Sequence, residues 1–183
     1  MLNKFRLIVS EVKEVGSARS SDNLERRLCK LYEELGELSE AYLGVTCPSN
    51  LKNKTIDDLR EEAIDCMIVA LDCALTQVDN STVVAALLPH VMESELRKPF
   101  TVAEVQDAIF KMGESNARAI VALKEKDYPL YFGAINSVVR YATQISFIDR
   151  DAFDPKRVDE IKSVFETKMN KWRKALAIYK EAA

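Results

Sequence analysis

Two pairs of carboxylates in this chain have a spacing that suits metal chemistry. Glu34 and Glu37 are three residues apart, and so are Glu62 and Asp65. On an α-helix that spacing puts both members of a pair on the same face. If the two helices lie side by side, four carboxylates face one another across a small space.

Such a group needs positive charge, because carboxylates about 4 Å apart repel each other strongly where water is scarce. The simplest counter-charge is a hard divalent cation that takes oxygen ligands, Mg2+ or else Mn2+. The alternative is that each pair belongs to a solvated helix face, since Glu is a good helix former. Taken together, the pairs predict a metal site with four ligands: Glu34, Glu37, Glu62 and Asp65.

The residues around the two pairs resemble a known family. The stretches KLYEELGELSEA, from Lys30, and LREEAIDCMIVAL, from Leu59, look like the two metal-binding helices of the MazG-like all-α nucleoside triphosphate pyrophosphohydrolases. The resemblance covers residues 24–75, and the family includes dimeric dUTPases and dCTP pyrophosphatases. It implies a house-cleaning hydrolase of nucleotide metabolism. Such an enzyme converts a (deoxy)nucleoside triphosphate and water to the monophosphate and pyrophosphate, with a metal-activated water attacking the α-phosphorus.

The same resemblance suggests roles for individual side chains. A carboxylate that the metal does not fully occupy can accept the proton of the attacking water, and one of Glu34 and Glu37 is expected to do so. The segment ETKMNKWRK, from Glu166, resembles a lysine-rich C-terminal helix of the family and offers Lys168 and Lys171 to the phosphates. The alternative is a solvated basic helix end that favours its own dipole.

Lysines outside that helix are further candidates for phosphate binding. Lys52 and Lys54 lie in the loop between the two acidic helices. Lys30 precedes Glu34 by one helical turn, so an ion pair between these two is expected. Asp72 continues the acidic stripe of its helix, and it either supports the metal site or is simply exposed, the second being favoured.

Apolar spacing and capping signals place these residues in an all-α bundle of six to seven helices. From Leu24 to Tyr42 the apolar residues repeat at four-three spacing, which is typical of a bundle seam. Pro89 is expected to kink or break its helix. No stretch alternates with a period of two for long enough to predict a strand. Helices are expected over residues 2–15, 22–44, 55–78, 81–97, 101–126, 129–147 and from 155 onward.

Composition bounds the partners and the setting. The formal net charge of −3 gives no reason to expect a nucleic acid or an anionic membrane as partner. No apolar run reaches the length of about 20 residues that spans a bilayer. The four cysteines lack C-x-x-C spacing and His90 is the single histidine, which argues against a zinc site. A reduced, cytoplasmic setting fits best.

Three segments in the second half of the chain resemble three segments in the first half, in the same order. The paired segments are 77, 71 and 73 residues apart. Lys111 then stands at the position of Glu34, Gly133 at that of Glu62, and Asn136 at that of Asp65. One half would hold metal while the other would have lost its ligands. The aligned segments are 111–119 with 34–42, 133–139 with 62–68, and 164–171 with 91–98.

This echo leads to a prediction about domain organisation. Residues 1–183 are expected to form a single all-α domain, with a metal-binding half at 24–100 and a degenerate or supporting half at 101–183. Family members often pair two like units around each site. The chain is therefore expected to form either a homodimer or an intramolecular pseudo-dimer.

Two other classes of protein compete with the hydrolase interpretation. A di-iron bundle ordinarily uses Glu-x-x-His pairs, and His90 lies in no such motif. A non-catalytic helical interaction protein with a decayed site remains the alternative, although all four acidic positions are intact. Residue spacing does not assign a reader for the nucleotide base.

Overall fold

The computed structural model describes residues 2–17, 24–47, 49, 53–76, 81–96, 100–148 and 155–181, and within them it has seven helices and no strand. This confirms the prediction of an all-α bundle of six to seven helices. No helix in these ranges is both long and apolar enough to cross a bilayer. The helices are α1 (Leu2–Ser17), α2 (Leu24–Thr46), α3 (Ile56–Thr76), α4 (Ser81–Glu95), α5 (Val102–Glu125), α6 (Tyr128–Ser146) and α7 (Pro155–Glu181).

Local capping explains why several helices begin where they do. Thr55 and Asp58 bond reciprocally at the start of α3, with the Asp58 carboxylate accepting from the Thr55 backbone N–H at 2.7 Å. Thr101 and Glu104 form a capping box at the start of α5. Asp127 accepts from the Leu130 backbone N–H at the start of α6. The first two of these starts were predicted from the sequence.

Three helices differ from the sequence prediction. Helix α1 continues to Ser17 instead of ending near residue 15. Helix α2 continues to Thr46 instead of ending at Gly44. Helix α4 continues through Pro89 without a break, although proline removes one backbone hydrogen bond. The neighbours Leu88 and Met92 are buried, and their burial offsets that loss.

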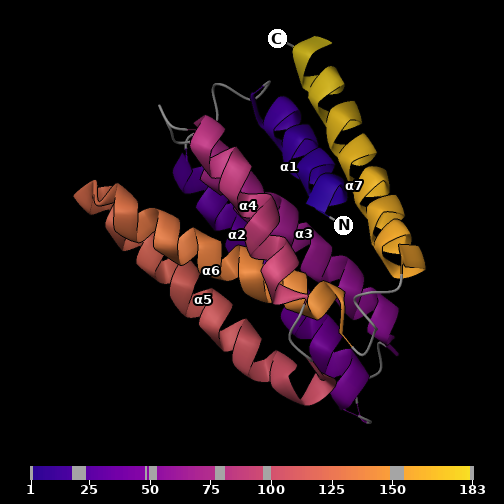
Figure 1. Cartoon of the computed structure of the whole chain (residues 1–183). Helices are drawn as coiled ribbons and strands as arrows, with labels where there is room; N and C mark the ends of the chain where they lie inside the picture. The colour runs from indigo at the N-terminus through magenta and orange to yellow at the C-terminus, as the bar shows by residue number, and fades with distance from the viewer. Residues whose placement is uncertain are drawn as a thin grey trace.

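Two antiparallel hairpins, α2–α3 and α5–α6, form the centre of the molecule (Figure 1). Helices α3 and α6 pack along each other in opposite directions. The Tyr131 hydroxyl donates to the Cys73 carbonyl at 3.0 Å near one end, and Arg60 donates to the Ile148 carbonyl at 2.6 Å near the other. Helix α3 is buried along almost its whole length, as its broad apolar face predicts.

The remaining helices cover this centre in a reciprocal way. Helix α4 follows the first hairpin and packs on α6, while α7 follows the second hairpin and packs on α3. Helix α1 contacts α3, α4 and α7, and it runs beside α7 in Figure 1. In an internal pseudo-dimer, the helix that follows each hairpin would likewise pack on the other hairpin. The duplication itself stays a prediction.

Asp72 is neither exposed nor near the acidic pairs, contrary to expectation. It is 2% exposed and forms an ion pair with buried Arg27 where α2 starts and α3 ends. Arg27 also donates to the Thr76 hydroxyl. Gly16 of α1 lies directly against the pair, so that a Cβ at this position would overlap the Asp72 carboxylate. A buried charge pair of this kind tolerates little displacement.

We expect Gly16→Ala to lower the free energy of unfolding by about 1–3 kcal/mol, because the added methyl group must displace a buried carboxylate from its partner. The measurement is urea denaturation followed by circular dichroism. Gly113→Ala is the matched control, since a Cβ there meets nothing within 4 Å. That control should be neutral or stabilising by up to about 1 kcal/mol. Equal effects at the two glycines would show that Gly16 is not a contact point.

Candidate metal centre

Three of the four predicted carboxylates come together where α2 and α3 lie side by side. One oxygen from each of Glu34, Glu62 and Asp65 can be chosen so that all three lie within 4.8 Å of one another. Glu34 is 7% exposed, and the other two are half-buried. The cluster thus lies at the edge of the core, between buried and half-buried positions.

The register of the α2–α3 hairpin brings the two acidic segments level with each other. At its closed end, Gly44 of α2 lies against Lys54, whose own Cβ is 2.5 Å from where a Cβ on Gly44 would stand. At its other end, the Arg27–Asp72 pair joins the same two helices. Because both ends are fixed, the carboxylates in the middle cannot move apart to relieve their repulsion.

Burial and mutual repulsion raise the pKa of all three carboxyl groups. For Glu34, Glu62 and Asp65, the main cause is the loss of water around the charged form. The charge of Asp65 raises the pKa of Glu34 and of Glu62 further, and Glu37 adds to the effect on all three. Nearby lysines act in the opposite direction without reversing it.

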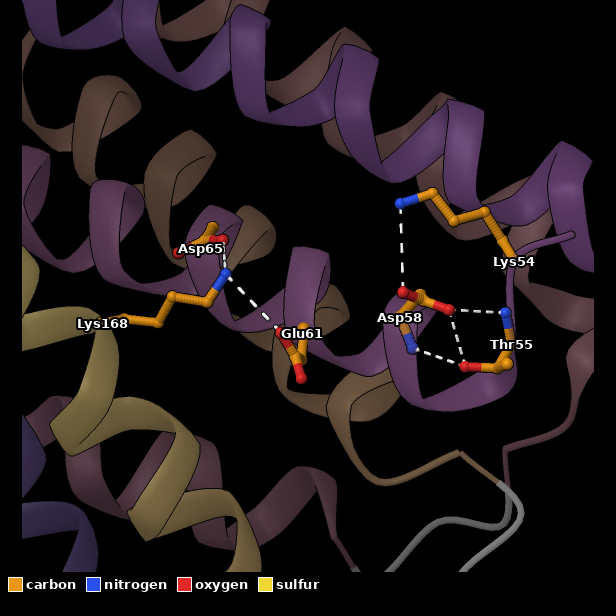
Figure 2. Close-up of polar contacts among 6 residues, drawn as sticks. All are labelled: Lys54, Thr55, Asp58, Glu61, Asp65 and Lys168. Atoms are coloured by element: carbon orange, nitrogen blue, oxygen red, sulfur yellow. Dashed lines mark hydrogen bonds and ion pairs between the residues drawn. The ribbon is translucent and has the colours of Figure 1, made fainter. Parts of the chain in front are cut away.

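Two lysines supply part of the missing positive charge. Lys30, one turn before Glu34, forms an ion pair with it at 2.8 Å, as predicted from the sequence. Lys168 extends from α7 to form a hydrogen-bonded ion pair with Asp65, and its Nζ lies 4.0 Å from a carboxylate oxygen of Glu61 (Figure 2). Burial alone would lower the pKa of Lys168, but these carboxylates raise it overall.

The other predicted site residues occupy the surroundings of the trio. Glu37 is exposed one turn beyond Glu34 and lies outside the trio, close enough to influence the pKa of each member. Lys171 is exposed on α7 and acts electrostatically on Asp65. Lys54 lies 3.9 Å from Asp58 at the start of α3, as Figure 2 shows. Lys52 lies outside the described residues.

Glu61 is a member of this neighbourhood that sequence reasoning missed. It is exposed, and it contributes through Lys168. The available signal was its position four residues before Asp65, which places both side chains on the face of α3 that α7 covers. Helix α7 is distant in sequence, so spacing alone did not show which lysine meets which carboxylate.

The residues present fit a hard divalent cation. The cluster offers carboxylate oxygens only, with no histidine or thiolate among the three, and Mg2+ and Mn2+ prefer such ligands. Burial is the main cause of the raised pKa values of these three carboxyl groups, and the charges of Lys30 and Lys168 do not reverse the rise. Comparisons with protein-family models, with curated proteins and with solved structures found no match to this chain.

The raised pKa values predict how stability depends on pH without added metal. A folded protein that holds its protons more tightly than the unfolded chain loses stability as pH rises through the window above the ordinary carboxyl pKa, about 4. We expect Glu62→Gln to reduce this loss, because it removes one charge without removing the Lys168–Asp65 ion pair. The measurement is the free energy of unfolding at about pH 4 and about pH 7 in chelator.

The control for this experiment is Glu61→Gln, which changes an exposed carboxylate one residue away that lies outside the trio. It should leave the pH dependence close to that of the wild type. The quantity to compare is the fall in the free energy of unfolding between about pH 4 and about pH 7. If this fall is as large in Glu62→Gln as in the wild type, the three carboxylates do not repel one another as described.

Lys168 provides a second test, because it occupies the place where a cation would relieve the same charge. Without Mg2+, Lys168→Met should lower the free energy of unfolding by about 1–3 kcal/mol, since it leaves Asp65 unpaired. Added Mg2+ should then raise the melting temperature of this variant more than that of the wild type. The measurement is differential scanning calorimetry with and without MgCl2.

Lys162→Met on the same helix is the control, because Lys162 forms a partly exposed ion pair with Glu166 at 3.1 Å. Such pairs contribute less than about 1 kcal/mol. Equal responses of the Lys168 and Lys162 variants to MgCl2 would contradict a cation site beside Asp65.

Proposed function

We propose that this chain is a magnesium-dependent nucleoside triphosphate pyrophosphohydrolase, as its resemblance to the MazG-like family implies. The observation that supports this proposal is the convergence of Glu34, Glu62 and Asp65 from two helices onto one point, with lysines around it. A triphosphate carries the opposite charge to those lysines and shares the metal with those carboxylates. The setting that fits this activity is the cytoplasm, where nucleotides are held.

The trio would hold Mg2+, or Mn2+, through its carboxylate oxygens. When bound, the ion would lower the pKa of a water molecule and neutralise charge on the phosphates. Glu34 is the most buried of the three and is anchored by Lys30, so it would fix the position of the ion. Glu62 and Asp65 are half-buried and would complete the ligand set from the facing helix.

Glu37 is the best candidate for the group that accepts the proton of the attacking water. It is exposed, it lies outside the trio, and it is near enough to interact with all three carboxylates. Glu34 could serve only by giving up its ion pair with Lys30. A general base needs an available oxygen beside the site, and Glu37 meets this condition better.

The reaction follows from these positions. The water oxygen forms a bond to the α-phosphorus while its proton moves to the Glu37 carboxylate. The bond from the α-phosphorus to the bridging oxygen breaks, and pyrophosphate leaves with that oxygen. Lys168 would exchange Asp65 for a phosphate oxygen, because its amine already reaches the cluster from α7. Lys171 and Lys54, and Lys52 in the same loop, would neutralise the departing pyrophosphate.

The competing interpretation is a helical interaction protein with a decayed site. It shares the same fold and predicts no turnover with any nucleotide. The discriminating experiment is a pyrophosphate-release assay over the common ribo- and deoxyribonucleoside triphosphates, with MgCl2 or with chelator. Metal-dependent release supports the enzyme, and the pattern of substrates identifies the base and the sugar.

Within that assay, Asp65→Asn and Glu37→Gln are expected to lower kcat/KM at least about 100-fold, because each removes a charged group that is used in the transition state. Both variants should stay folded, and the melting temperature of Glu37→Gln should be close to that of the wild type. Glu114→Gln is the matched control: this exposed glutamate follows Gly113 in the second half as Glu37 follows Gly36 in the first. Full activity in either test variant would rule out its assignment.

A further inference from the structure

A second concave site lies away from the acidic cluster, between α3, α4 and α6. Its volume is about 460 Å³, which is within the range of cavities that hold small organic ligands. Ala74 forms its α3 wall, nine residues beyond Asp65, which is roughly 13 Å along the helix. The residues that matter most for its chemistry are Leu87, Leu88, Val91, Phe132, Gly133 and Asn136.

The wall of this cavity is uncharged. Among the described residues that line it there is no lysine, arginine, aspartate or glutamate. A triphosphate would find no partner for its charge there. An uncharged ligand with a largely apolar body is therefore the class that fits, and the half-buried ring of Phe132 offers an aromatic contact to it.

Asn136 gives the cavity a specific polar group. Within the described part of the chain, its side-chain amide forms no hydrogen bond, and its Oδ1 is buried without a partner. An amide carries a donor and an acceptor side by side. The part of this amide that lines the cavity can form a hydrogen bond with a polar group on one edge of a ligand ring.

In the alignment of the two halves of the chain, the lining of this cavity corresponds to a groove beside the acidic cluster. The groove between α3 and α7 beside the acidic cluster is lined in part by Glu61, Glu160, Ile161 and Val164. In the alignment of the two halves, Glu61 of α3 corresponds to Phe132, which is 71 residues later. The three α7 positions correspond, 73 residues earlier, to Leu87, Leu88 and Val91. Glu61 and Glu160 of the groove are thus replaced by apolar side chains, while Gly133 and Asn136 stand at the positions of Glu62 and Asp65.

We propose that this cavity binds a neutral aromatic heterocycle of nucleobase or nucleoside size. The ring packs against Phe132 and the apolar residues of α4, and its polar edge pairs with the Asn136 amide. The site binds without metal, since its wall offers no carboxylate. The proposal does not depend on the pyrophosphohydrolase activity, because the two sites share no lining residue.

The test uses five nucleosides as probes: adenosine, guanosine, cytidine, uridine and thymidine. Binding to the full chain is measured by saturation-transfer NMR and by titration, in chelator. Gly133→Leu should weaken the binding of at least one nucleoside more than about tenfold, because a Cβ at Gly133 meets nothing within 4 Å and the side chain can occupy the cavity. Asn136→Leu should weaken it about three- to tenfold through the lost hydrogen bonds.

Gly113→Leu is the matched control, since its Cβ is equally unobstructed and it does not line the cavity. It should bind nucleosides as the wild type does. The proposal is overturned if no nucleoside binds at millimolar concentration, or if binding is equal in the Gly133 and Gly113 variants. It is also overturned if Asp65→Asn abolishes binding, or if sedimentation shows that Gly133→Leu disrupts a dimer, because this face would then contact a second copy of the chain.

Discussion

The structure depends on an electrostatic conflict between two packed helices. Helices α2 and α3 bury a continuous apolar seam, and this packing forces Glu34 against Glu62 and Asp65. Separating the helices would expose the seam, at a cost of about 25 cal/mol for each Å² of apolar surface. The conflict is therefore resolved locally, by protons, by Lys30 and Lys168, or by a divalent cation.

The surrounding helices determine how the conflict is resolved. Gly44 and the buried Arg27–Asp72 pair fix the two ends of the α2–α3 hairpin. Helix α7 brings one lysine to the open side of the cluster. On the other side, helices α4 and α6 pack in a similar way. Their described residues form no acidic cluster and line an apolar cavity instead. The two sides thus have similar architecture and opposite chemistry.

Much of this could be predicted from the sequence, because it depends on local rules. Helical spacing and capping predicted the element order. The three-residue spacings selected Glu34, Glu37, Glu62 and Asp65, of which the structure brings Glu34, Glu62 and Asp65 together. What could not be predicted depends on contacts between distant segments. The burial of Asp72 requires Arg27 and Gly16 from two other helices. Glu37 is exposed because of how α2 is rotated about its own axis. An error of one residue in the predicted helical periodicity changes that rotation by about 100°.

The central claim is that Glu34, Glu62 and Asp65 share one divalent cation. The most direct measurement is a crystal structure of the protein grown with Mn2+, with anomalous diffraction data collected at the manganese absorption edge. The account predicts an anomalous peak in contact with oxygens of all three carboxylates, with the Lys168 amine displaced from Asp65. An ordered cluster with no peak, and with Lys168 still bound to Asp65 at saturating Mn2+, would contradict it.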